Sequence, residues 1–128
     1  MNCLSLNIRG CEEPHKIEWL RRLKNTHRPD FIGLQETRVA DSTSIKFSEA
    51  WGNDEFEMEY VNPTGRSGGI ISIWDPNIFS KSQIVKKCNF IAVTGVWKGV
   101  SSKITVVNVY GPQSRGDKKK TYGLNYLN

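Results

Sequence analysis

The opening segment, residues 1–34, constrains the fold most, because it reads as strand, helix and strand in immediate succession. Residues 3–10 alternate apolar and polar side chains, which predicts a strand with one buried face. Residues 12–25 carry acidic residues first, basic residues last and apolar residues at helical spacing between them, which predicts a helix. Pro29 breaks that helix, and the apolar run at residues 31–34 predicts a short buried strand. Such an opening predicts that the two strands pair in parallel.

Beyond residue 55 the pattern becomes mostly antiparallel β. Residues 41–55 are mixed, and Asp41 or Ser42 is placed to cap a short helix there. Strands are expected at residues 56–61, 89–97 and 103–111, and residues 65–74 are expected to form a glycine-rich turn that enters a strand. The strands at 89–97 and 103–111 predict an antiparallel hairpin. The predicted fold class is α/β, with a large sheet or two stacked sheets and helices outside.

Residues 1–117 are predicted to form one domain or part of a larger one, and residues 118–128 a basic, weakly ordered tail. Hydrophobic residues make up 38% of the chain, which is enough for a packed core. The net charge of +5 suits a phosphate-bearing partner, but it also suits many ordinary soluble proteins.

The cysteines and the apolar runs indicate the cellular compartment in which the protein is expected. Cys3, Cys11 and Cys88 show no CxxC spacing, so we expect neither a disulfide partner nor a zinc site, and an intracellular location. No apolar run approaches the roughly 20 residues that span a bilayer. The N-terminus also lacks the pattern of a signal peptide, so no membrane partner is expected.

Polar side chains stand at three predicted strand ends: Asn7, Glu36 and Tyr110, with Asn108 on the same face as Tyr110. Each alone has an ordinary reading, as a turn former, a solvated acid or a half-buried edge aromatic. As a set they indicate a site, since parallel strands bring Asn7 and Glu36 together. One carboxylate beside an amide is a partial shell for a hard cation such as Mg²⁺, which keeps several waters.

A second candidate element is the glycine-rich turn before residue 70. Arg66 adds a basic side chain, and Gly68 and Gly69 allow the backbone to approach a phosphate. The alternative is a tight turn with no ligand. His15 and His27 show no ligand spacing and read as ordinary surface residues.

Four segments in order, LNIRG, DFIGLQET, RSGGI and VVNVYGPQ, resemble the endonuclease/exonuclease/phosphatase superfamily. The closest resemblance is to the endonuclease domains of LINE-type (non-LTR) retrotransposons, especially those of plants, and it covers about residues 1–117. It implies a two-sheet β-sandwich flanked by helices, here the N-terminal half of one.

The resemblance also implies roles for single residues. Glu36 matches the family's metal-binding glutamate, Asn7 the strand-end asparagine beside the metal, and Tyr110 the tyrosine that contacts the scissile phosphate. Gln113 stands where the family usually has Asn. The implied cofactor is Mg²⁺, with Mn²⁺ as a substitute. The implied partners are the DNA phosphate backbone and a downstream reverse transcriptase domain, and the implied location is the nucleus.

The departures from the family pattern predict an inactive fragment. No GDxN segment and no C-terminal Asp–His pair are present, so the later catalytic groups are missing. Losing one member of such a set usually costs orders of magnitude in rate. Two alternatives remain open: a non-catalytic basic module that binds nucleic acid or phosphate, and an exonuclease or small-phosphate phosphatase of the same superfamily.

Overall fold

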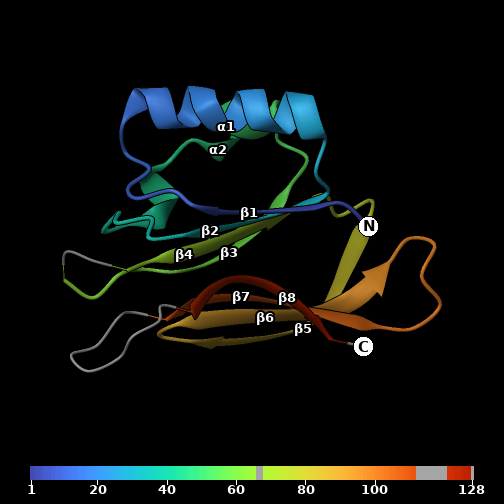
Figure 1. Cartoon of the computed structure of the whole chain (residues 1–128). Coiled ribbons are helices and arrows are strands. Elements are labelled where there is room, and N and C mark those ends of the chain that lie inside the picture. Colours follow the sequence, from blue (N-terminus) through green and yellow to red (C-terminus); the bar gives the residue numbers. More distant parts are fainter. Residues whose placement is uncertain (66–67, 112–120, 128) are drawn as a thin grey trace.

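The computed structural model describes residues 1–65, 68–111 and 121–127, the last of these by the backbone alone. The described strands form two four-stranded sheets, with the orders β1-β2-β4-β3 and β5-β6-β7-β8. The sheets stack as a sandwich, and α1 and α2 cover the outer face of the first sheet (Figure 1). The elements in chain order are β1 (Cys3–Asn7), α1 (Pro14–His27), β2 (Phe31–Gln35), η1 (Ser42–Ser44, a 3₁₀ turn), α2 (Phe47–Trp51), β3 (Glu57–Val61), β4 (Ile70–Trp74), β5 (Phe79–Lys87), β6 (Phe90–Trp97), β7 (Ile104–Gly111) and β8 (Thr121–Leu127). This confirms the predicted fold class.

The opening of the chain folds as predicted. β1 and β2 pair in parallel, with Asn7 opposite Gln35 at the end of the register. The helix between them begins at Pro14, where the missing N–H costs nothing, and ends at His27, followed by its C-cap Arg28 in the left-handed conformation. The hairpin of β6 and β7 is also confirmed.

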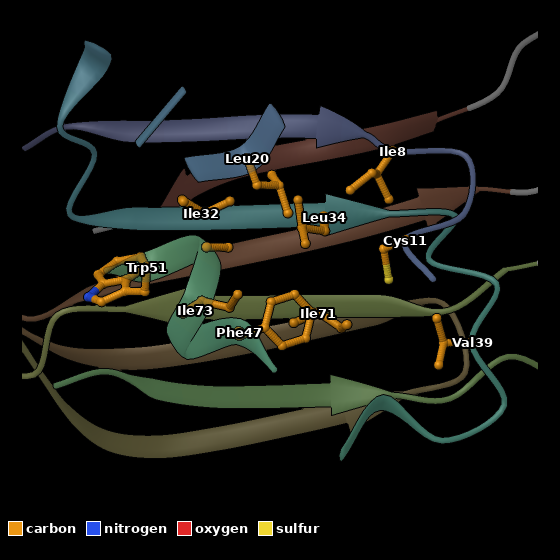
Figure 2. Close-up of a cluster of buried hydrophobic side chains, with 11 residues drawn as sticks. Ile8, Cys11, Leu20, Ile32, Leu34, Val39, Phe47, Trp51, Ile71 and Ile73 are labelled. Atoms are coloured by element: carbon orange, nitrogen blue, oxygen red, sulfur yellow. The ribbon is translucent and has the colours of Figure 1, made fainter. Parts of the chain in front are cut away.

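The middle strands of the first sheet are buried on both faces, which explains why β2 and β4 are apolar without alternation. One face packs under α1 and α2, as Figure 2 shows, with Ile32, Leu34, Ile71 and Ile73 facing the helices. The other face packs against the second sheet, and there Phe31 joins a core of aromatic and β-branched residues. Its ring stacks on Trp74 at 5.5 Å between centroids.

Two strands differ from the prediction. β5 was not predicted, because eight of its nine side chains are exposed or half-buried and its sequence is polar. Thr121–Leu127 were predicted to lie in a basic, weakly ordered tail; in the structure their backbone forms β8 and pairs antiparallel with β7, and the division of the chain at residue 117 stays a prediction. Main-chain hydrogen bonds to β7 define this edge strand, and they need no apolar alternation. Residues 118–120 lie outside the described residues.

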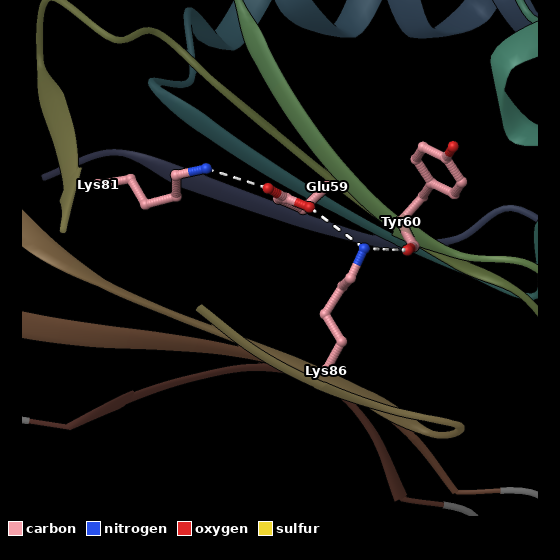
Figure 3. A network of polar contacts seen from close by, with 4 residues as sticks. All are labelled: Glu59, Tyr60, Lys81 and Lys86. Carbon is pink, nitrogen blue, oxygen red and sulfur yellow. Dashed lines mark hydrogen bonds and ion pairs between the residues drawn. The ribbon is translucent and has the colours of Figure 1, made fainter. Parts of the chain in front are cut away.

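An ionic bridge joins the two sheets at the edge formed by β3 and β5. Glu59 on β3 accepts from Lys81 Nζ at 3.1 Å and from Lys86 Nζ at 3.3 Å (Figure 3). Lys86 Nζ also donates to the main-chain carbonyl of Tyr60 at 3.2 Å. Charged side chains on both edges also discourage pairing with another chain. None of the described helices is long and apolar enough to cross a membrane.

Candidate functional site

The candidate site is built where β1 and β2 end. The parallel pairing continues past both strands, since Ile8 N donates to Gln35 O at 3.0 Å and Gly10 N to Glu36 O at 2.7 Å. The loop after β1 therefore lies directly against the segment that carries Glu36.

The other side of the Glu36 segment is held by the glycine-rich turn. Thr37 N donates to Gly69 O at 3.1 Å, and Arg38 N donates to Gly68 O at 3.0 Å. Main chain from two distant parts of the sequence, the loop after β1 and the glycine-rich turn, thus fixes the Glu36 segment. A ligand-binding side chain gains precision from this kind of support.

The backbone around Glu36 is unusual. Arg9, Glu36 and Arg38 have positive φ angles of 52°, 54° and 55°. Such values are uncommon for residues other than glycine, and they gather at functional sites when the surroundings enforce them. The hydrogen bonds to the neighbouring loops supply that enforcement here.

Glu36 is a nearly buried carboxylate with one partner from β7 in the second sheet and one from the loop that follows β2. Its side chain is only 7% exposed, and Tyr110 Oη, at the end of β7, donates to Oε1 at 3.0 Å. Arg38 Nη2 lies 3.7 Å from Oε2, and the Arg38 side chain is 44% exposed. Two of the predicted site residues, Glu36 and Tyr110, are therefore in direct contact.

Asn7 completes the predicted set. It ends β1 opposite Gln35, and its Oδ1 is buried with no hydrogen-bond partner among the described residues. A buried acceptor without a donor costs free energy, so such an atom points to a ligand or a water.

Asn108 has a structural role in the core between the sheets. It is fully buried between the sheets, where Oδ1 accepts from Gln35 Nε2 at 2.9 Å. Its Nδ2 donates to Ile71 O at 2.9 Å and to Ser72 Oγ at 3.1 Å. Asn108 thus ties three strands together beneath the site, a role that its place in a β-branched run did not reveal.

Close packing requires glycine at position 69, whereas at position 68 it is the positive φ of +88° that favours glycine. A Cβ at Gly69, where φ is +89°, would collide with Thr37 Oγ1, and a Cβ at Gly68 would lie 3.9 Å from the Tyr110 ring. The tight-turn reading is therefore sufficient for Gly69, and phosphate contact at both positions stays a prediction. Arg66 and Gln113 lie outside the described residues.

A hollow of about 150 Å³ opens beside Tyr110. Gly68, Gly69 and Tyr110 form part of its wall, together with Cys88 and Asn89 from the turn between β5 and β6. Tyr110 N donates to Asn89 O at 2.9 Å, which fixes that turn against the site. A small group bound here would lie within reach of the tyrosine.

The donor set fits a hard, oxygen-preferring cation better than zinc. Glu36 offers a carboxylate and Asn7 an unpartnered amide oxygen, both of which are ligands typical of Mg²⁺. Within the described part of the chain, no three His, Cys, Asp or Glu side chains come together as a complete metal cluster. The two side chains would form a partial shell, with water filling the rest.

Comparison with known proteins identifies the fold. No protein-family model matches the chain, and no curated protein does. Among solved structures, AP endonuclease LMAP from Leishmania major is similar, with a TM-score of 0.61 and 14% sequence identity. The match covers 86% of this chain but only 39% of that protein. The chain therefore shares the two-sheet α/β architecture of an AP endonuclease over about two fifths of that enzyme's length.

Proposed function

We propose that the chain is the N-terminal part of a metal-dependent phosphodiesterase domain of the endonuclease/exonuclease/phosphatase superfamily. The carrying observation is the contact between Tyr110 and Glu36. The unpartnered Oδ1 of Asn7, which lies opposite Gln35 at the end of β1, adds a second oxygen at the same strand ends. The shared fold with an AP endonuclease supports this reading. The resemblance of the four motifs to LINE-type endonucleases suggests DNA as the substrate, a downstream reverse transcriptase domain and a nuclear location.

In this proposal Glu36 and Asn7 hold a divalent cation, Mg²⁺ or Mn²⁺. When bound, the cation would supply charge stabilisation for phosphoryl transfer. Tyr110 would orient the Glu36 carboxylate through its hydroxyl and present its ring edge to a phosphate group. The main-chain hydrogen bonds from the neighbouring loops would hold the Glu36 backbone in place before the cation binds. Binding would then cost no further conformational entropy of that backbone.

The isolated chain is proposed to be inactive or nearly so. Both histidines belong to α1 and not to the strand ends that carry the site. His15 pairs with Glu13 at the start of the helix, and His27 is its last residue. The sequence also carries no GDxN segment and no C-terminal Asp–His pair, the groups that the resemblance implies for positioning and activating the nucleophile. A cation site without a positioned base retains little catalysis.

Two measurements on the 128-residue chain test the proposal. Direct Mn²⁺ binding should be detectable in the wild type and lost in Glu36→Gln, because the substitution removes the charged ligand. Magnesium-dependent plasmid nicking should be close to background in both. Mn²⁺ binding that is unchanged in Glu36→Gln would contradict the cation site, and strong nicking abolished by Glu36→Gln would contradict inactivity.

A second candidate function is a non-catalytic module that binds nucleic acid. The net charge of +5 and the lysines along β5 favour it. DNA binding in this case would be salt-sensitive, independent of divalent cations and unchanged in Glu36→Gln. Binding that requires a divalent cation and Glu36 would instead favour the first function.

A further inference from the structure

We propose that Arg38 acts as an internal counter-cation for Glu36 and becomes a phosphate contact when a divalent cation replaces it. The guanidinium neutralises the carboxylate in the metal-free protein, and the bound cation releases it toward a substrate phosphate. This inference rests on the proposed function, in which Glu36 is a cation ligand.

The geometry separates the two oxygens of Glu36. Oε1 accepts from the Tyr110 hydroxyl at 3.0 Å, whereas Oε2 lies 3.7 Å from Arg38 Nη2. That second distance is too long for a hydrogen bond and within the range of an ion pair, so the attraction is mainly Coulombic. A cation that approaches Oε2 therefore has no short hydrogen bond to Arg38 to break.

Arg38 combines a fixed backbone with an accessible side chain. Its N–H donates to Gly68 O at 3.0 Å, and its φ angle is 55°. Its side chain is 44% exposed, whereas that of Glu36 is 7% exposed. The side-chain stem passes close to Gly10, since a Cβ there would lie 3.9 Å from Arg38 Cδ. The guanidinium can thus turn about its own side-chain bonds without disturbing the main chain.

The difference in burial distinguishes this pair from an ordinary surface ion pair. The pair of Arg22 and Glu18 on α1 is more than half exposed on both sides, and water screens it. Glu36 is largely removed from water, so its charge needs a nearby positive group. Arg38 meets this need when no metal ion is present.

A guanidinium and a divalent cation repel each other when both lie within about 4 Å of one carboxylate oxygen. Binding of the cation therefore shifts Arg38 away from Oε2. A guanidinium held at the rim of such a site is well suited to a phosphate, because its N–H groups match two phosphate oxygens. Removing Arg38 should strengthen cation binding and weaken the effect of the cation on DNA binding.

The first test measures Mn²⁺ affinity of the full chain from the free-Mn²⁺ paramagnetic resonance signal. Arg38→Gln should bind Mn²⁺ about threefold more tightly than the wild type, the scale of a partly exposed ion pair. Arg22→Gln removes the same charge from an exposed ion pair on α1 and should leave the affinity unchanged. Circular dichroism and the urea midpoint establish that each variant is folded.

The second test measures the affinity for a short DNA duplex in EDTA and in Mn²⁺. In the wild type Mn²⁺ should strengthen DNA binding, and in Arg38→Gln this gain should shrink by about threefold, because coupling between two ligands is reciprocal. Arg22→Gln should keep the full gain. A gain that is equal in Arg38→Gln and the wild type would overturn the proposal.

Arg38→Lys and Glu36→Gln separate the remaining outcomes. Lysine keeps the charge, so its Mn²⁺ affinity should stay within about twofold of the wild type. An affinity in Arg38→Lys as high as in Arg38→Gln would overturn the counter-cation role. Wild-type Mn²⁺ affinity in Arg38→Gln, with loss in Glu36→Gln, would overturn this inference and leave the proposed function standing. Undiminished binding in Glu36→Gln would overturn both.

Discussion

The Tyr110 hydroxyl donates to Glu36 Oε1 at 3.0 Å and so connects the end of β7 in one sheet to the end of β2 in the other. The two residues are 74 positions apart in the chain. This single contact makes the orientation of the candidate ligand depend on the packing of the whole sandwich.

Tyr110→Phe should therefore lower the free energy of unfolding by about 2 kcal/mol, the range for hydrogen bonds to ionised groups. Mn²⁺ affinity should fall as well, since Glu36 loses a group that orients it. Urea unfolding and Mn²⁺ titration check the two effects. Tyr60→Phe is the control, because Tyr60 contacts Lys86 through its ring and its main-chain carbonyl. Equal losses in both variants would contradict a specific role for the Tyr110 hydroxyl.

Asn108→Ala should be among the most destabilising substitutions in the core. It leaves Gln35 Nε2 without its 2.9 Å acceptor and opens a cavity between the sheets, for a cost of about 3 kcal/mol. Urea unfolding measures the loss. Asn25→Ala on the exposed side of α1 is the matched control and should change stability by less than about 0.5 kcal/mol. A small effect at Asn108 would show that water replaces the network at little cost.

Gly69→Ala should disturb the site through packing as well as through backbone strain. A Cβ there would collide with Thr37 Oγ1, so we expect a loss above about 2 kcal/mol and weaker Mn²⁺ binding. Gly99 has a similar φ of +87° but open space around it, so Gly99→Ala reports strain alone, at about 1 kcal/mol. Equal losses in the two variants would argue against a collision with Thr37.

Glu59→Gln should weaken the edge that β3 and β5 form. Glu59 accepts from Lys81 and Lys86, and all three side chains are 20–39% exposed, so we expect a loss of about 1 kcal/mol at low salt. The difference from the wild type should shrink in 1 M NaCl, where the Debye length is about 3 Å. A difference that is independent of salt would indicate a packing effect. Glu55→Gln, at an exposed position before β3, is the control.

Cys11 and Cys88 should differ in reactivity. Burial raises the pKa of the Cys11 thiol to about 11, with a smaller contribution from the charge of Glu12. Cys11 should therefore resist a thiol reagent at pH 8, whereas exposed Cys88 reacts quickly. Because the folded state disfavours the thiolate, Cys11 contributes stability below pH 9 that is lost as the pH rises toward 11. Labelling of Cys11 as fast as that of Cys88 would contradict its burial.

Local patterns were sufficient to predict several parts of the fold. The parallel pairing of β1 and β2, the helix between them and the hairpin of β6 and β7 were all predictable, because each depends on neighbours along the chain. The same reasoning placed Asn7 and Glu36 together, since adjacent parallel strands end at the same edge. β5 and β8 were not predicted as strands, because edge strands are defined by their main-chain partners and not by side-chain periodicity.

The sequence by itself determined which side chains stand at the ends of β1 and β2, because residue spacing along adjacent strands sets that order. Only the tertiary structure decided that Tyr110 reaches Glu36, that Asn108 supports the core and that Arg38 faces Oε2. The first two depend on how the sheets stack, and the third on a left-handed turn that the glycine segment enforces. Both arise from contacts between residues far apart in the chain, which a local pattern does not encode.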